Sequence, residues 1–160
     1  MEEKSDFDEK TVTLVRSVIE DRALWLYVLF KQMKADFCSE KAESIARKAI
    51  YEYGKIKSAQ NPNVKSPHDW IDMHNKGINH LVFSSTTEKT ERQDEQKFTY
   101  CPLVEAWKKV GCTKDEIDLL CSMAMEGDNG MAAGAGIDLE LPKRLAAGDD
   151  CCHFILKKKK

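Results

Sequence analysis

Hydrophobic side chains recur every three or four positions through most of residues 1–60, which is the period of an α-helix. Between residues 8 and 34 they form one long stripe that broadens toward its end. A second apolar face of the same period spans residues 42–53, with Ser39 as a suitable N-cap and Gly54 as a candidate end. The first part of the chain is therefore predicted to be a helical hairpin.

The pattern changes in the middle of the chain. Ser66 and the proline after it predict the start of a short helix that ends at Gly77. Residues 80–87 are apolar and β-branched and predict a strand, residues 88–94 a charged turn, and residues 95–100 a return strand. This segment is predicted to be a β-hairpin that leads directly into a helix.

Residues 101–128 predict two short helices. Pro102 suits the first helical position, Gly111 suits the end of the first helix, and Thr113 with Glu116 makes a capping box for the second. The apolar positions that define the two faces are Leu103, Ala106, Trp107 and Val110, followed by Ile117, Leu120, Cys121 and Ala124.

The last segment returns to strands. The glycine-rich residues 130–136 are predicted to be flexible, and residues 136–141 alternate between apolar and polar side chains. In the final predicted strand, residues 151–157, Cys152 shares the core-facing side while His153 lies on the other.

The order of these elements predicts an α+β fold: an N-terminal helical hairpin packed on a four-stranded antiparallel sheet, with two short helices between the β-hairpins. The whole chain, residues 1–160, is predicted to be a single domain. The helical hairpin occupies residues 1–60 and the sheet portion residues 66–157.

Composition narrows the function. The 160 residues carry a net charge of −2, which gives no reason to expect nucleic acid as a partner. The longest apolar run, residues 23–30, is too short to span a membrane, and the first twenty residues lack a secretory signal. Six cysteines without a C-x-x-C pair suggest reduced thiols in the cytoplasm.

Three cysteines are candidates for chemistry. Cys101 precedes a predicted helix, where free N–H groups and the helix dipole would lower the pKa of its thiol. Cys121 is predicted on a buried helix face and Cys152 on a core-facing strand position. Three converging thiols would suit a covalent site or a thiophilic metal such as zinc, although the same pattern is typical of a core that tolerates cysteine.

Four further residues each have both a functional and a purely structural interpretation. Glu105 lies one helical turn after Cys101 and is either an acid–base catalyst or an exposed glutamate. Asp128 is predicted at a helix C-terminus, where the helix dipole disfavours its charge. Asp149 is most simply a turn residue, and His153 is a ligand, a base or an exposed strand residue.

Three segments carry a family resemblance: CPLVEAWKKVG, DLLCSMAMEGD and GIDLELPKRLAAGDDCCHF. Over residues 98–154 the chain resembles the L-2-amino-thiazoline-4-carboxylic acid hydrolase family. The resemblance implies hydrolytic opening of a cyclic amidine-like ring to an N-carbamoyl-cysteine. By the same resemblance, the expected catalytic positions are Cys101, Glu105, Asp128 and Cys152, and the expected substrate-binding positions are Cys121 and Asp149. His153 is added to the substrate-binding positions because it lies beside the cysteine pair.

The general layout is also similar to the small-molecule-binding 4-vinyl-reductase-type domains. That similarity implies an alternative function, a non-enzymatic sensor of a small molecule or a metal. A partner-docking role for the broad apolar face of the first helix is a third candidate.

The first helix also predicts self-association. Its apolar face around Trp25, Tyr27 and Phe30 is wider than one side of a two-layer domain easily covers. A homodimer and complete burial within one chain both remain consistent with this pattern.

Overall fold

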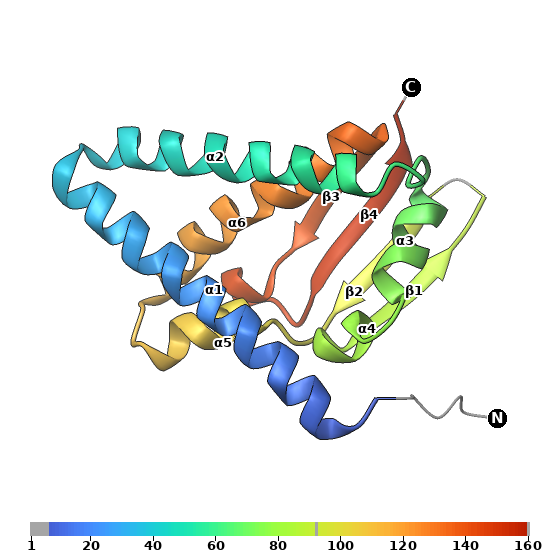
Figure 1. Cartoon of the computed structure of the whole chain (residues 1–160), viewed down its shortest axis with the longest axis horizontal. Coiled ribbons are helices and arrows are strands. Elements are labelled where there is room, and N and C mark those ends of the chain that lie inside the picture. Colours follow the sequence, from blue (N-terminus) through green and yellow to red (C-terminus); the bar gives the residue numbers. More distant parts are fainter. Residues whose placement is uncertain (1–6, 92, 160) are drawn as a thin grey trace.

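The computed structural model describes residues 7–91 and 93–159. The helices are α1 (Glu9–Asp36), α2 (Ser39–Gln60), α3 (Pro67–Asn75), α4 (Asn79–Val82), α5 (Pro102–Lys109) and α6 (Lys114–Ala135), with a 3₁₀ turn η1 (Leu145–Ala147). The strands are β1 (Ser85–Lys89), β2 (Asp94–Phe98), β3 (Ile137–Lys143) and β4 (Cys152–Lys158). This arrangement, shown in Figure 1, confirms the predicted α+β class.

The strands form one sheet in the order β1-β2-β4-β3, and each neighbouring pair is antiparallel. Helix α3 and the end of α6 pack on the same sheet face, where Trp70 and Ala135 meet Phe154 and Leu156 of β4. Alternation along β4 explains this face, because every second side chain of a strand points to the same side.

The helical hairpin reaches the sheet through other helices. Helix α2 packs along α6, and α1 packs along α5. The indole N–H of Trp107 in α5 donates a hydrogen bond of 2.9 Å to the carbonyl oxygen of Ala23 in α1. Figure 1 shows α1 and α2 diverging from their short connection, so they do not form a closely paired layer.

Helix α6 is longer than predicted, and the prediction of a flexible segment after Asp128 was wrong. The helix continues to Ala135 and ends at Gly136, which adopts a left-handed conformation with φ of 70°. Its internal glycines cost helix stability but permit very close contact with α2. The close packing of α2 against α6 compensates for the low helix propensity of these glycines.

Gly54 was wrongly predicted to end α2. It is buried, and the helix continues to Gln60. A Cβ atom at Gly54 would lie only 2.0 Å from the carbonyl oxygen of Gly127 in α6. Gly54 is therefore a packing position and not a helix end.

The predicted strand at residues 80–87 begins later than expected. Residues Asn79–Val82 form the short helix α4, and β1 starts at Ser85. The Arg16 side chain of α1 donates to the carbonyl oxygens of Leu81 and Val82 at 3.0 and 2.9 Å, which satisfies the end of this helix. A long-range contact thus overrides the β propensity of these residues.

The predicted starts of α3 and α6 are confirmed. The hydroxyl of Ser66 accepts a hydrogen bond from the Asp69 amide at 3.2 Å, and Thr113 with Glu116 forms the complete capping box. Helix α2 begins one residue earlier than predicted, since Cys38 occupies the N-cap. Among the described residues, no helix is both long enough and apolar enough to cross a membrane.

Candidate functional site

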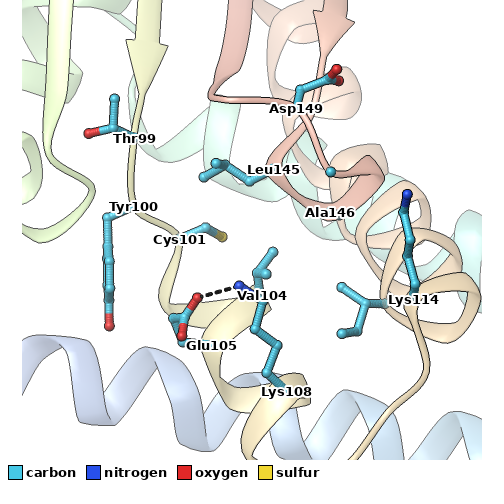
Figure 2. A pocket seen from close by; sticks show the side chains of 12 residues that line it. Thr99, Tyr100, Cys101, Val104, Glu105, Lys108, Lys114, Leu145, Ala146 and Asp149 are labelled. Atoms are coloured by element: carbon cyan, nitrogen blue, oxygen red, sulfur yellow. Dashed lines mark hydrogen bonds and ion pairs between the residues drawn. The ribbon is translucent and has the colours of Figure 1, made fainter.

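A cavity of about 440 Å³ opens where the chain leaves β2 and enters α5. Figure 2 shows it enclosed by the α5 N-terminus, the start of α6 and the loop that contains η1. Its lining residues are Thr99, Tyr100, Cys101, Val104, Glu105, Lys108, Lys114, Ile117, Leu145, Ala146, Gly148 and Asp149. Apolar walls and a few polar groups together are typical of a small-molecule site.

Cys101 is the N-cap of α5 and is half-buried. Figure 2 shows its sulfur directed toward the space between Leu145 and Val104. Burial raises the pKa of the Cys101 thiol, while the backbone N–H groups of Val104 and Leu103 lower it by less. The prediction that the helix N-terminus would lower this pKa was therefore wrong, because desolvation of the thiolate outweighs the N–H donors.

The three thiols lie within electrostatic range of one another, which is less than the predicted convergence in one cavity. Burial raises the pKa of Cys121 to about 12, and the charges of Cys152 and Cys101 contribute. Burial also raises the pKa of Cys152 to about 11, although the Leu145 amide donates to its sulfur at 3.3 Å. At neutral pH these thiols are protonated.

Proximity does not make these thiols a metal site. Within residues 7–91 and 93–159, no group of three or more His, Cys, Asp or Glu residues is arranged to hold a metal ion. Cys101 is also the only one of the three thiols that lines the cavity. The zinc alternative therefore has no support in the described geometry.

Glu105 faces the same cavity as Cys101. Its carboxylate accepts a hydrogen bond of 2.9 Å from the Lys108 ammonium, also on α5, as the dashed line in Figure 2 shows. The negative charge of Glu105 contributes to the raised pKa of Cys101. A carboxylate thus lies within electrostatic range of the thiol.

Lys114 is a lining residue that sequence reasoning missed. It is the first residue of α6, and its ammonium lies 3.2 Å from where a Cβ on Gly148 would be. It makes no ion pair or side-chain hydrogen bond with any residue in the described part of the chain. The signal for it in the sequence was its position directly after the capping residue Thr113, at a helix end that favours anions.

Asp128 lies inside α6 and not at a helix C-terminus, as was predicted. Burial raises its pKa to about 6, and Arg22 of α1 opposes that shift. The side chain does not line the cavity, but its charge contributes to the raised pKa of Cys101. Asp128 therefore influences Cys101 through its charge, without contacting the cavity.

The structure separates the other two predicted substrate-binding residues. Asp149 lies at the cavity rim, and its carboxylate accepts a hydrogen bond of 2.8 Å from the Arg144 amide, as a turn residue does. His153 does not line the cavity and lies 2.7 Å from a Glu95 carboxylate oxygen on β2. Of the seven predicted site residues, Cys101, Glu105 and Asp149 line one cavity.

A second polar cluster between α3 and β2 was not predicted. Asp94 is fully buried, and its carboxylate lies 2.8 Å from Nδ1 of the exposed His68. His74 is half-buried and lies 3.0 Å from the amide oxygen of Gln96, and desolvation lowers the pKa of its imidazole. Strand alternation gave no hint of these contacts, since Asp94 and Gln96 are polar residues on the core-facing side.

The fold and the site together define an α+β protein whose cavity holds a thiol, two carboxylates and two ammonium groups. The sequence matches the L-2-amino-thiazoline-4-carboxylic acid hydrolase family over residues 16–156, and the chain belongs to that family. This match extends far beyond the region of the resemblance at residues 98–154. No curated protein matches the chain.

A solved structure shares the fold. The crystal structure of a trafficking protein particle complex subunit 3 from Naegleria fowleri, covalently bound to palmitic acid, superposes with a TM-score of 0.59. The two sequences are 14% identical, and the match covers 88% of this chain and 95% of that chain. At this identity the similarity concerns the fold alone.

Proposed function

We propose that this protein is a hydrolase that opens a small cyclic amidine-like ring of the thiazoline carboxylate type. The observation that carries the proposal is the position of the Cys101 sulfur in a cavity that also contains Glu105 and Lys114. The family supplies the reaction class, hydrolysis of a thiazoline carboxylate.

The first step in this proposal is attack by Cys101 on the ring carbon between nitrogen and sulfur. Because the Cys101 pKa is raised, the thiol must lose its proton as it attacks, and Glu105 accepts that proton. The bond from the ring carbon to the ring sulfur breaks, and the leaving sulfur receives the proton as a thiol. The substrate is then joined to Cys101 as an isothiourea.

Water completes the reaction. It adds to the same carbon with Glu105 as the base, and the Cys101 sulfur leaves and regains a proton. The carbon becomes the carbonyl of an N-carbamoyl group, so one water is consumed and the enzyme is restored. Because the pKa of Cys101 is raised, its thiolate is a poor leaving group, so the sulfur receives a proton as it leaves.

Lys114 is proposed to bind the substrate carboxylate. Its ammonium lies beside Gly148 and has no ion-pair partner among the described residues, whereas Lys108 is paired with Glu105. The proposal predicts that Lys114→Gln raises KM about tenfold with little change in kcat, because the carboxylate is bound equally in ground and transition states.

The test is turnover of 2-amino-thiazoline-4-carboxylate, followed by release of the product thiol. Cys101→Ala and Glu105→Gln should each lower kcat/KM by about 10²-fold or more. Cys38→Ser is the matched control, since Cys38 is the exposed thiol and should leave turnover unchanged. Full activity in Cys101→Ala would show that water attacks the ring carbon directly and that no covalent intermediate forms.

A second candidate is ligand binding without turnover. The related fold that carries palmitic acid in covalent linkage favours it, as do the apolar cavity residues Val104, Ile117 and Leu145. Wild-type protein that binds the thiazoline carboxylate stoichiometrically in calorimetry but releases no thiol would support this candidate and overturn the hydrolase.

A further inference from the structure

One face of α1 is apolar and exposed along four turns. Trp25 is 75% exposed, although large aromatic side chains are usually buried. The other members of this face, here named the α1 stripe, are Leu14, Val18, Val28 and Leu29. Their spacing places all five on one side of the helix.

The α1 stripe is distinct from the face that packs inside the molecule. Ala23 and Phe30 of α1 are buried in the core, with Phe30 only 5% exposed, and Tyr27 packs against the same cluster. The sequence-based assignment of Phe30 to a self-association face was therefore wrong. Figure 1 shows α1 running along the outside of the molecule, and the side chains of the stripe are exposed.

Two charged residues lie at the middle of the stripe. Asp21 and Arg22 are both exposed, and neither makes an ion pair or side-chain hydrogen bond with any residue in the described ranges, although the charge of Arg22 also reaches Asp128 of α6. An apolar surface interrupted by one acid and one base needs a partner that supplies both opposite charges at the same place.

We propose that the α1 stripe is the interface with a second copy of this chain, in which the two α1 helices cross antiparallel about a two-fold axis. If the axis passes between Asp21 and Arg22, then Asp21 of each copy faces Arg22 of the other. Residues equally distant from the axis also meet, so Leu14 packs on Leu29 and Val18 on Trp25. Each contact occurs twice, as a two-fold interface requires.

A second copy fits this surface better than a lipid bilayer does. Helices that lie in a membrane surface carry lysine and arginine on the polar flank, whereas Asp21 places a carboxylate in the centre of this apolar stripe. Against acyl chains that carboxylate would be desolvated without a counter-charge. Against a second copy it meets an arginine.

The test uses Trp25 as its own reporter. Trp25 is the only exposed tryptophan among the three, since Trp70 and Trp107 are fully buried. We expect light scattering at micromolar concentration to give twice the 18.2 kDa chain mass, and dilution to shift the emission to longer wavelength as Trp25 enters water. A monomer at that concentration, with emission unchanged on dilution, would overturn the proposal.

Variants define the interface. Trp25→Glu and Val18→Glu should each give monomers with unchanged helical circular dichroism. Ile56→Glu should remain dimeric, because Ile56 is equally apolar and 58% exposed but lies on α2. A monomeric Ile56→Glu together with a dimeric Trp25→Glu would assign the interface to α2 instead.

Charge reversal tests the antiparallel arrangement. Asp21→Arg alone and Arg22→Asp alone should each weaken the dimer by about tenfold or more, since like charges then face one another. The double variant, with both residues exchanged, should recover the wild-type dissociation constant. Failure of the double variant to recover, with its fold intact, would reject the two-fold crossing at this point. Monomers that instead bind anionic vesicles through Trp25 would show that the occupant is a membrane.

Discussion

At the scale of single residues, burial outweighs the nearby partners of Cys101 and Asp128. The backbone N–H groups of Val104 and Leu103 act to lower the pKa of Cys101, yet burial raises it. Asp128 has the charge of Arg22 within range, yet its pKa rises to about 6. Both groups lose hydration that nearby partners do not replace, so both favour their neutral forms.

Asp128 gives a stability prediction with a defined sign. A carboxyl whose pKa is raised by folding costs nothing below its ordinary pKa near 3.8 and destabilises the fold increasingly as the pH rises to about 6. Asp128→Asn should therefore leave the free energy of unfolding unchanged at pH 3.5 and increase it above pH 6, by up to about 3 kcal/mol. Urea unfolding at several pH values measures this difference.

Asp150→Asn is the control of opposite sign. Lys143 lowers the pKa of Asp150, so removing that carboxylate should bring no gain in stability above pH 6. If Asp128→Asn and Asp150→Asn behave alike, burial of Asp128 is not the cause of its effect.

At the scale of elements, the contact between α2 and α6 organises the helical half. Glycine allows the two backbones to approach closely, because a Cβ at Gly54 would meet the Gly127 carbonyl oxygen and one at Gly130 would lie 2.2 Å from the Tyr51 carbonyl oxygen. At each of these two positions the clash is with backbone, which cannot rotate away. The distance between the helices is therefore set by the absence of side chains.

Gly54→Ala and Gly127→Ala should have opposite effects. The first forces α2 and α6 apart and should lower the free energy of unfolding by about 1–3 kcal/mol or more. The second adds a Cβ whose nearest neighbour is the Ile50 side chain at 3.5 Å, an ordinary contact. It should raise stability by up to about 1 kcal/mol through better helix propensity. Thermal and urea unfolding measure both variants. Equal losses of stability in Gly54→Ala and Gly127→Ala would show that the helix contact does not depend on Gly54 in the proposed way.

At the scale of the whole molecule, α6 connects two hydrophobic clusters. One cluster joins α1, α5 and α6 around Trp107, and the other joins α3, α6 and the sheet around Trp70. Met125 of α6 packs against both clusters. A shared rigid helix should make the two halves unfold together.

The single-domain prediction can be tested with these two tryptophans. A Trp25→Phe, Trp107→Phe variant reports the sheet half through Trp70, and a Trp25→Phe, Trp70→Phe variant reports the helical half through Trp107. Their urea unfolding midpoints should each coincide with the circular dichroism midpoint of the same variant. A fluorescence transition well separated from loss of helix would divide the chain into two folding units.

The sequence by itself determined the features that depend on a few neighbouring residues. Ser66 and the Thr113–Glu116 box marked helix starts, and alternation in residues 151–157 marked the strand whose Cys152 side faces the core. Caps and strand alternation are decided by bonds within three or four residues, so they can be recognised without knowledge of the fold. The three cysteines and Glu105 were identified for the same reason, because each occupies a locally defined position.

Only the tertiary structure decided the features that depend on distant partners. Gly54 continues a helix because α6 lies against it, and residues 79–82 form a helix that Arg16 caps from α1. Lys114 became a candidate because a loop more than thirty residues later closes the cavity beside it. The pKa of Cys101 was predicted in the wrong direction because burial is a property of the assembled core, and the sequence shows only the helix start that opposes it.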